Sequence, residues 1–232
     1  MPQWIVGCGL KNEMNSTLEY IKKKYHLSYD ISMPIILKRI GRHSGLKELF
    51  RELGFQTGAE IGTKSGTYAK ELCIALPDLK LYCIDPWKAY KDYQEEWAKD
   101  QNTMNNLYEE TKNKLSRYNC EIIRKTSMEA VKGFKKDTLD FVFIDGNHEF
   151  SFVLDDITKW AKVVRPGGIV FGHDYMPDHD GVMRTVQEYI TKNKINPWFI
   201  LHVRGQADCW MFVKPENQSG ILYDTKQINL GS

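Results

Sequence analysis

Strand-like segments alternate with helix-like segments along most of this chain, and this alternation restricts the fold more than any other feature. Seven short segments are rich in β-forming residues: Ala59–Gly62, Leu79–Ile84, Cys120–Arg124, Leu139–Asp145, Gly168–Gly172, Trp198–Val203 and Cys209–Val213. Helical patterns lie between the first five segments and before the sixth: Gly66–Ala75, Tyr93–Tyr118, Met128–Phe134, Phe150–Val164 and Gly181–Lys192. This order predicts an α/β fold with a parallel sheet and helices on both faces.

Three further features refine this prediction. The apolar run Phe141–Ile144 lacks polar alternation, which indicates a strand buried on both faces. The short link Arg204–Asp208 predicts that the last two strands form an antiparallel hairpin at one edge. Residues 1–55 contain no comparable strand and look helical, so we interpret them as an N-terminal cap. We expect residues 56–215 to form the main domain and the polar residues 216–232 to form a C-terminal tail.

The composition argues against several classes of protein. A chain of 232 residues suits one large domain with an extension, and its net charge of +2 gives no bias toward nucleic acid. No apolar run approaches the length of a membrane span, and residues 1–10 lack the pattern of a signal peptide. The 5 cysteines are widely spaced without a C-x-x-C pair. We therefore expect a cytoplasmic protein that binds neither membrane nor nucleic acid, and the sequence leaves a homodimer open.

The segment after the first strand indicates the kind of ligand. Ligands of open parallel sheets bind beyond the carboxyl ends of the strands. There the chain reads A-E-I-G-T-K-S-G (59–66), and Gly62 and Gly66 allow the turn to pass close beneath a ligand. The G-x-G-x-x-G pattern of dinucleotide-binding loops is absent, and Glu60 would repel a phosphate. The motif suits a cationic amino-acid group, with an ordinary glycine turn as the alternative.

Two further strand ends carry candidate cofactor contacts. Asp85 ends the second strand, where a carboxylate can accept hydrogen bonds from both hydroxyls of a ribose. The alternative for Asp85 is a helix N-cap. Ser127, after the third strand, suits either a helix cap or a contact with adenine.

Together, four motifs resemble the class I S-adenosylmethionine-dependent methyltransferases over about residues 44–214. They are A-E-I-G-T-K-S-G, C-I-D-P-W (83–87), F-V-F-I-D-G-N-H (141–148) and R-P-G-G-I-V-F-G-H-D-Y (165–175). The resemblance implies a Rossmann-like, seven-stranded sheet of order 3-2-1-4-5-7-6, with strand 7 antiparallel. It also implies a set of residues that bind S-adenosyl-L-methionine: Glu60, Gly62, Thr63, Lys64, Ser65, Gly66, Asp85, Pro86, Trp87, Ser127, Met128 and Asp145. Among these, the glycine loop would hold the methionine part, Asp85 the ribose, and Ser127 and Met128 the adenine.

The ends of strands four and five resemble those of metal-dependent O-methyltransferases of small molecules, in the catechol and macrolide-sugar branches. Asp145 and Asp174 would lie on neighbouring strands about 4.8 Å apart and could share a divalent cation, magnesium or manganese. His173 is the expected third ligand. His148 and Asp145 are the expected catalytic residues, with His148 as the base that deprotonates a hydroxyl.

The chain departs from both branches. The catechol branch has an aspartate followed by an asparagine at strand five, and a lysine base where this chain has His148. The macrolide-sugar branch has a histidine at that place but two acids at strand five, where this chain has His173 and Asp174. Alternatives therefore remain: Asp145 contacts only the cofactor, His148 orients its loop, and His173 is a packed side chain. We expect His179 and Asp180 to be loop and N-cap residues.

The predicted function is divalent-metal-assisted O-methylation of a hydroxyl on a small molecule, either a sugar or a phenol. Two alternatives are a non-catalytic S-adenosylmethionine-binding domain and a methyltransferase that acts on another nucleophile without metal. Methyltransferases of nucleic-acid bases commonly carry an [N/D]-P-P-[Y/F/W] turn after strand four, and this chain carries D-G-N-H there. A nicotinamide dehydrogenase would need the glycine pattern that is missing.

Overall fold

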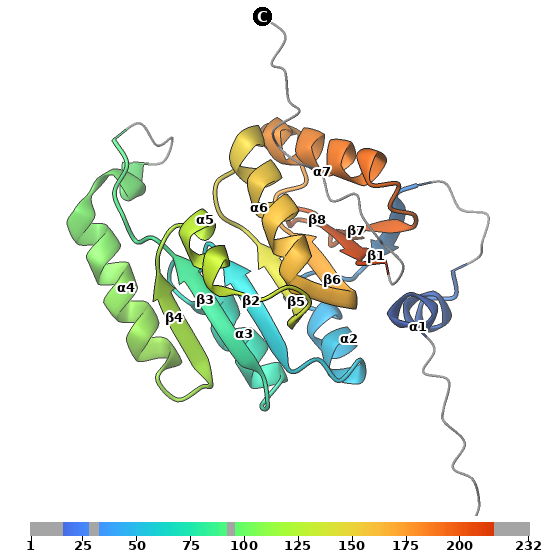
Figure 1. The fold of residues 1–232 in the computed structure, drawn as a ribbon, viewed down its shortest axis with the longest axis horizontal. Helices are drawn as coiled ribbons and strands as arrows, with labels where there is room; N and C mark the ends of the chain where they lie inside the picture. The colour runs from blue at the N-terminus through green and yellow to red at the C-terminus, as the bar shows by residue number, and fades with distance from the viewer. Residues whose placement is uncertain (1–15, 28–32, 92–95, 216–232) are drawn as a thin grey trace, which may run out of the picture.

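A single sheet organises the described part of the chain. The computed structural model describes residues 16–27, 33–91 and 96–215, so the predicted C-terminal tail lies outside the described residues. The sheet has 8 strands in the order β1-β7-β8-β6-β5-β2-β3-β4 (Figure 1). The strands are β1 (Ile35–Lys38), β2 (Thr57–Ile61), β3 (Lys80–Asp85), β4 (Cys120–Arg124), β5 (Leu139–Ile144), β6 (Val164–Gly172), β7 (Trp198–His202) and β8 (Cys209–Val213).

The predicted strand order is confirmed for the seven strands from β2 to β8. Read from β4 to β7, they follow the order 3-2-1-4-5-7-6, and β8 runs antiparallel to both β6 and β7. One boundary differs, because β6 begins at Val164 and not at Gly168. Val164 pairs with Leu139, and the register shifts before Phe141 pairs with Ile169, so the R-P-G segment is an irregularity within the strand.

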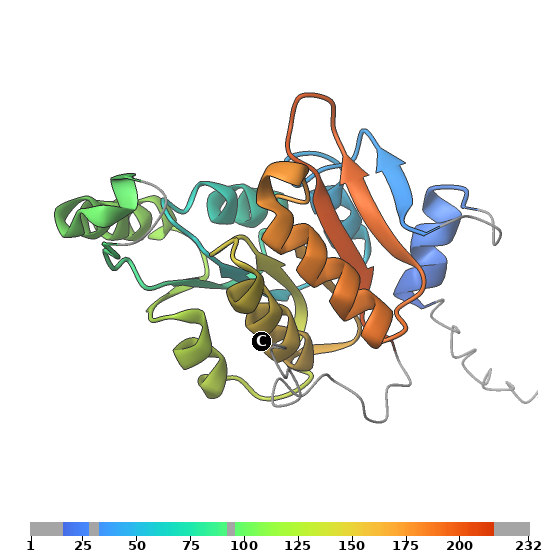
Figure 2. The same ribbon diagram turned by 90° about the horizontal axis from the view of Figure 1, so that it is seen from above.

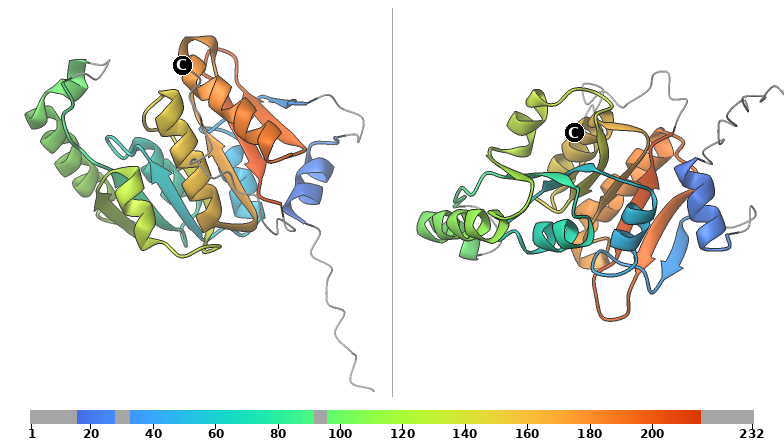
Figure 3. Two further views of the ribbon diagram at one scale, coloured as in Figure 1. Left: turned by 45° about the horizontal axis from the view of Figure 1, so that its top comes forward. Right: turned by 90° about the horizontal axis from the view of Figure 1, so that it is seen from below.

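The prediction that residues 1–55 contain no strand is wrong. Ile35–Lys38 pairs in parallel with β7 and adds an eighth strand at the edge of the sheet, beside α1 (Thr17–Lys24) (Figure 3). Ile35 and Leu37 are buried, whereas Ile36 is exposed. A strand of four residues is too short for its periodicity to identify it, and its pairing depends on the backbone groups that β7 offers.

Helices cover both faces of the sheet (Figure 2). Besides α1, the α-helices are α2 (Leu46–Glu52), α3 (Thr67–Ala75), α4 (Gln101–Leu115), α5 (Ser127–Ala130), α6 (Phe150–Val163) and α7 (Asp180–Lys192). The 3-10 turns are η1 (Glu96–Lys99), η2 (Val131–Gly133) and η3 (Pro177–His179). The first four helices share one apolar core and the last three share the other. None of the described helices is long and apolar enough to cross a membrane.

Strand β5 supplies both cores, as its apolar sequence predicts. Phe141 and Phe143 face the core of α1 to α4, whereas Val142 and Ile144 face the core of α5 to α7. The direction of chain progress reverses between β2 and β5, since β3 and β4 lie on one side of this pair and β6 on the other. In open α/β sheets, ligands bind at such a reversal.

The loops after β2 and β5 are in close contact at this reversal. Gly62 has a φ of +87°, and a Cβ added to it would lie 2.1 Å from the carbonyl oxygen of Asp145. The backbone N–H of Asp145 in turn donates to the carbonyl of Ile61 at 2.9 Å. A side chain at position 62 would therefore separate the two loops.

We expect Gly62→Ala to lower the free energy of unfolding by roughly 2–5 kcal/mol, since left-handed strain and overpacking add together. Urea unfolding followed by circular dichroism measures this change. Gly54→Ala is the matched control: Gly54 has a φ of +67°, and no described atom lies within 4 Å of an added Cβ. That variant should lose only about 1–2 kcal/mol. Equal losses in the two variants would contradict the close contact between the loops.

Candidate active site

A cavity of about 1000 Å³ opens at the carboxyl ends of β2, β3, β5 and β6. With the exception of Gly66, every residue that the sequence predicts for cofactor binding lines this cavity. Gly66 instead precedes α3 with a φ of +69°, where an added Cβ would meet side chains of Thr111 and Leu115 in α4. The structure therefore brings the predicted cofactor residues together, and Gly66 serves the packing of the turn below them.

Glu60 contributes a buried carboxylate to this cavity. Its side chain lies at the end of β2 and only 2% of the residue is exposed. Burial raises the pKa of Glu60 well above its usual range, although a hydrogen bond with Thr63 opposes the rise. Among the described residues, no group forms a hydrogen bond with its Oε2 atom. A ligand that donates a hydrogen bond, above all a cationic one, would satisfy this oxygen.

Asp85 connects the loop after β2 with the loop after β3, and both loops line the cavity. Its carboxylate accepts the backbone N–H of Lys64 at 2.9 Å and that of Trp87 at 2.7 Å. The indole of Trp87 donates to the carbonyl of Lys64 at 2.7 Å, which closes the network. Burial raises the pKa of Asp85, and these two backbone hydrogen bonds oppose the rise. Each carboxylate oxygen has a further lone pair, so the residue can still accept hydrogen bonds from a ligand.

Ser127 does not cap the helix that follows β4. Thr126 occupies the N-cap and forms a capping box with Glu129. The hydroxyl of Ser127 lies in the cavity wall, donates to Asp156 and accepts the indole N–H of Trp160 at 2.8 Å. Burial raises the pKa of Asp156 to about 7, and the bond from Ser127 opposes the rise.

Three predicted metal ligands meet at the ends of β5 and β6. Suitable ligand atoms of Asp145, His173 and Asp174 lie within 4.8 Å of one another. His173 Nδ1 lies 2.8 Å from Asp174 Oδ1 and 3.7 Å from Asp145 Oδ1. Asp174 adopts a φ of +55°, a left-handed conformation that is uncommon for non-glycine residues.

The pKa values of the two carboxyls move in opposite directions. Burial raises the pKa of Asp145, and the charges of His173 and Arg42 oppose the rise. Burial would also raise the pKa of Asp174, but hydrogen bonds from His148 and His173 lower it below its usual range. Asp174 is therefore the carboxylate whose negative charge is better stabilised.

Arg42 is a site residue that the sequence did not reveal. Its Nη1 lies 2.6 Å from Asp145 Oδ2, and its guanidinium lies 5.9 Å from the ring centroid of Tyr68. Arg42 belongs to the segment between β1 and α2, which the sequence left without chemical interpretation. The pairing of β1 with β7 and the contact of His43 with Glu71 in α3 hold this segment at the cavity, so no local motif could have identified Arg42.

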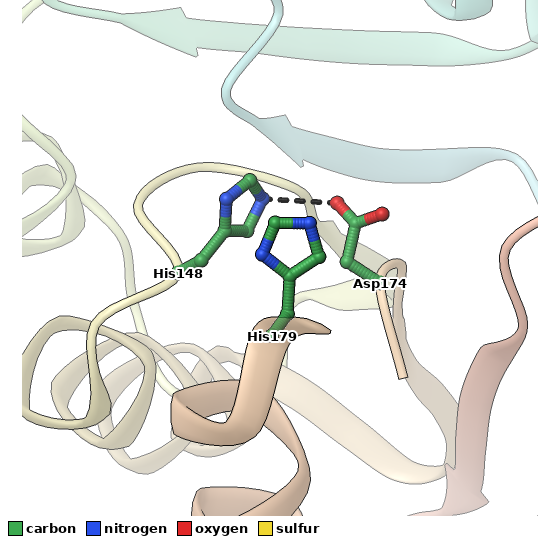
Figure 4. A group of neighbouring side chains, drawn as sticks. All are labelled: His148, Asp174 and His179. Carbon is green, nitrogen blue, oxygen red and sulfur yellow. Dashed lines mark ion pairs between the residues drawn. The ribbon is translucent and has the colours of Figure 1, made fainter. Parts of the chain in front are cut away.

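His148 and His179 lie beside Asp174 (Figure 4). His148 Nε2 is 2.9 Å from Asp174 Oδ2, and the ring centroids of the two histidines are 4.4 Å apart. The expectation that Asp180 caps a helix is wrong, because His179 occupies the N-cap of α7 and Asp180 is the first helical residue. The carboxylate of Asp180 lies 3.5 Å from Arg184.

The residues at the ends of β5 and β6 fit a divalent cation. Carboxylate oxygens suit magnesium or manganese, and one imidazole ligand shifts the preference toward manganese. Arg42 binds Oδ2 of Asp145, whereas Oδ1 of the same carboxylate faces His173. The guanidinium therefore does not block the oxygen that belongs to the candidate metal site.

The fold and this cavity define a class I S-adenosylmethionine-dependent methyltransferase. A family described as a methyltransferase domain matches residues 59–175, half of the chain, and the chain belongs to this family. Among curated protein sequences, none matches the chain.

Solved structures share the fold. An O-methyltransferase from Bacillus cereus in complex with SAH has a TM-score of 0.55 and 16% identity, over 88% of this chain and 94% of that chain. An O-methyltransferase from Streptomyces achromogenes, involved in tomaymycin synthesis and in complex with SAM, has a TM-score of 0.55 and 17% identity. That match covers 88% of this chain and 92% of the other.

Proposed function

We propose that this protein methylates a hydroxyl of a small molecule, a sugar or a phenol, with the help of a divalent cation. The observation that carries the proposal is the cluster of Asp145, His173 and Asp174 with His148 at the rim of the cavity. Solved O-methyltransferases with SAH or SAM bound share the fold and support the same reaction type.

The cavity offers a partner for each part of S-adenosylmethionine, the methyl donor. Glu60 would bind the amino group, since its buried oxygen needs a donor. Asp85 would accept the ribose hydroxyls, with Pro86 and Trp87 beside it. Ser127 and Met128 would line the adenine. Thr63, Lys64 and Ser65 lie in the loop that would hold the methionine part.

Asp145, His173 and Asp174 would hold the cation. When bound, a divalent cation lowers the pKa of a coordinated hydroxyl. His148 would accept the hydroxyl proton, while its contact with Asp174 orients the imidazole and stabilises the imidazolium that forms. The substrate oxygen would then attack the methyl carbon while the carbon–sulfur bond of the donor breaks, with S-adenosylhomocysteine as the leaving group.

A metal-free methyltransferase is the second candidate, and the Arg42–Asp145 ion pair favours it. The guanidinium already neutralises part of the negative charge at the end of β5, at 2.6 Å from Asp145. In that case Arg42 and His148 would contact the substrate hydroxyl, and Asp145 would contact only the cofactor.

Methyl transfer from isotope-labelled S-adenosylmethionine to a panel of sugars and phenols tests the function. We expect turnover that disappears with a chelator and returns with magnesium or manganese, because the cluster should then activate the hydroxyl. Full turnover in the chelator would favour the metal-free candidate. Cofactor binding without transfer to any panel member, with or without metal, would contradict a sugar or phenol as the substrate.

The ribose assignment predicts that Asp85→Ala weakens S-adenosylmethionine binding by roughly 2–3 kcal/mol, because two charge-assisted hydrogen bonds are lost. Isothermal titration calorimetry should show a loss of affinity of roughly 30- to 150-fold. Asp78→Ala, at an exposed acid away from the cavity, is the control and should bind normally. Unchanged affinity in Asp85→Ala would contradict the assignment.

The role of His148 predicts that His148→Ala loses on the order of 10²–10⁴ in kcat while cofactor affinity barely changes. Steady-state kinetics and calorimetry separate the two quantities. His26→Ala, at an exposed histidine in the segment after α1, should keep full turnover. If His148→Ala turns over normally but has a lower Tm, His148 only stabilises its loop.

A further inference from the structure

A second group of potential metal ligands lies beside the first. Suitable ligand atoms of His148, Asp174 and His179 also fall within 4.8 Å of one another (Figure 4). His148 and Asp174 line the cavity, whereas His179 is not among the lining residues. This second group therefore extends from the rim of the cavity toward the beginning of α7.

The two groups share Asp174 but use different oxygens of its carboxylate. Oδ1 lies 2.8 Å from His173 Nδ1, and Oδ2 lies 2.9 Å from His148 Nε2. His179 belongs only to the second group, so a substitution of His179 alters this group and leaves the side chains of Asp145 and His173 unchanged.

The backbone holds the two histidines of the second group together. Gly181 packs so closely on the loop before α6 that an added Cβ would lie 2.3 Å from the carbonyl oxygen of His148. The hydroxyl of Thr185 donates to the carbonyl of Phe150 at 3.1 Å, which joins α7 to the beginning of α6. The close approach of the two rings thus follows from the packing of α6 against α7 and not from the rotamers alone.

The chemistry of the second group differs from that of the first. Two imidazoles and one carboxylate suit zinc and related transition metals, whereas magnesium prefers oxygen ligands. Three protein ligands also leave room for water at a zinc ion.

We propose that His148, Asp174 and His179 form a second site for a zinc-like divalent ion, which shares Asp174 with the first group, and that the ion inhibits methyl transfer by occupying His148. The inhibitory half rests on the proposed function, since it needs His148 to be the base. The binding half does not. A cell could then lower the activity through transition-metal availability while magnesium is constant.

Titration of the metal-free protein with zinc, in competition with a chromophoric chelator, tests the binding half. We expect binding by the wild type, a loss of affinity of at least about tenfold in His179→Phe, and little change in Asp145→Asn, which alters only the first group. His179→Asn serves as a second variant if the phenylalanine lowers the Tm. Unchanged zinc affinity in both His179 variants would overturn the site, and so would loss of zinc binding in Asp145→Asn.

Methyl-transfer assays at fixed magnesium test the inhibitory half. Zinc should inhibit the wild type, and His179→Phe should keep its basal turnover and need at least about tenfold more zinc for the same inhibition. Equal sensitivity of the two proteins would overturn the inhibitory half. The zinc titration needs no substrate, so it decides the binding half even if no methyl transfer is observed.

Discussion

The direct contact between the loops after β2 and β5 is the constraint on which the rest of the site depends. The absence of a side chain at Gly62 lets these loops touch, and the hydrogen bond from Asp145 to Ile61 keeps them in register. One loop carries the predicted methionine contacts and the other carries Asp145 and His148. This contact therefore places the predicted methionine contacts beside the loop that carries the proposed base.

Charge is distributed unevenly around this contact. Glu60 and Asp85 are buried carboxyls whose pKa values are raised, so both would gain from a ligand that supplies hydrogen-bond donors. Burial also raises the pKa of Asp145, although the charges of His173 and Arg42 oppose the rise, whereas hydrogen bonds from His148 and His173 lower the pKa of Asp174 and stabilise it as an anion. The carboxyl ends of β2 and β3 therefore favour a cationic, hydroxyl-rich ligand, whereas the ends of β5 and β6 favour a metal or a proton transfer.

The segment before β2 belongs to the active site as well as to the sheet. Strand β1 extends the edge beside β7, and the turn that follows it delivers Arg42 to Asp145. A substrate in the cavity could contact Arg42 in this segment, a residue that is not part of the family motifs. Substrate preference would then depend on the part of the chain that lies outside the matched family region of residues 59–175.

The sequence by itself predicted the alternation of strands and helices and, through motifs that resemble a known family, the order of the seven core strands and a set of cofactor residues that, apart from Gly66, line the cavity. The motifs are local patterns: an apolar run such as Phe141–Ile144, a glycine at a turn, and an acid at the end of a strand. Tertiary structure alone decided the role of β1, the ion pair of Arg42 and the position of His179 beside His148. Each of these joins residues that are distant along the chain, and a short edge strand, a lone arginine or a loop histidine carries no periodic signal of its own.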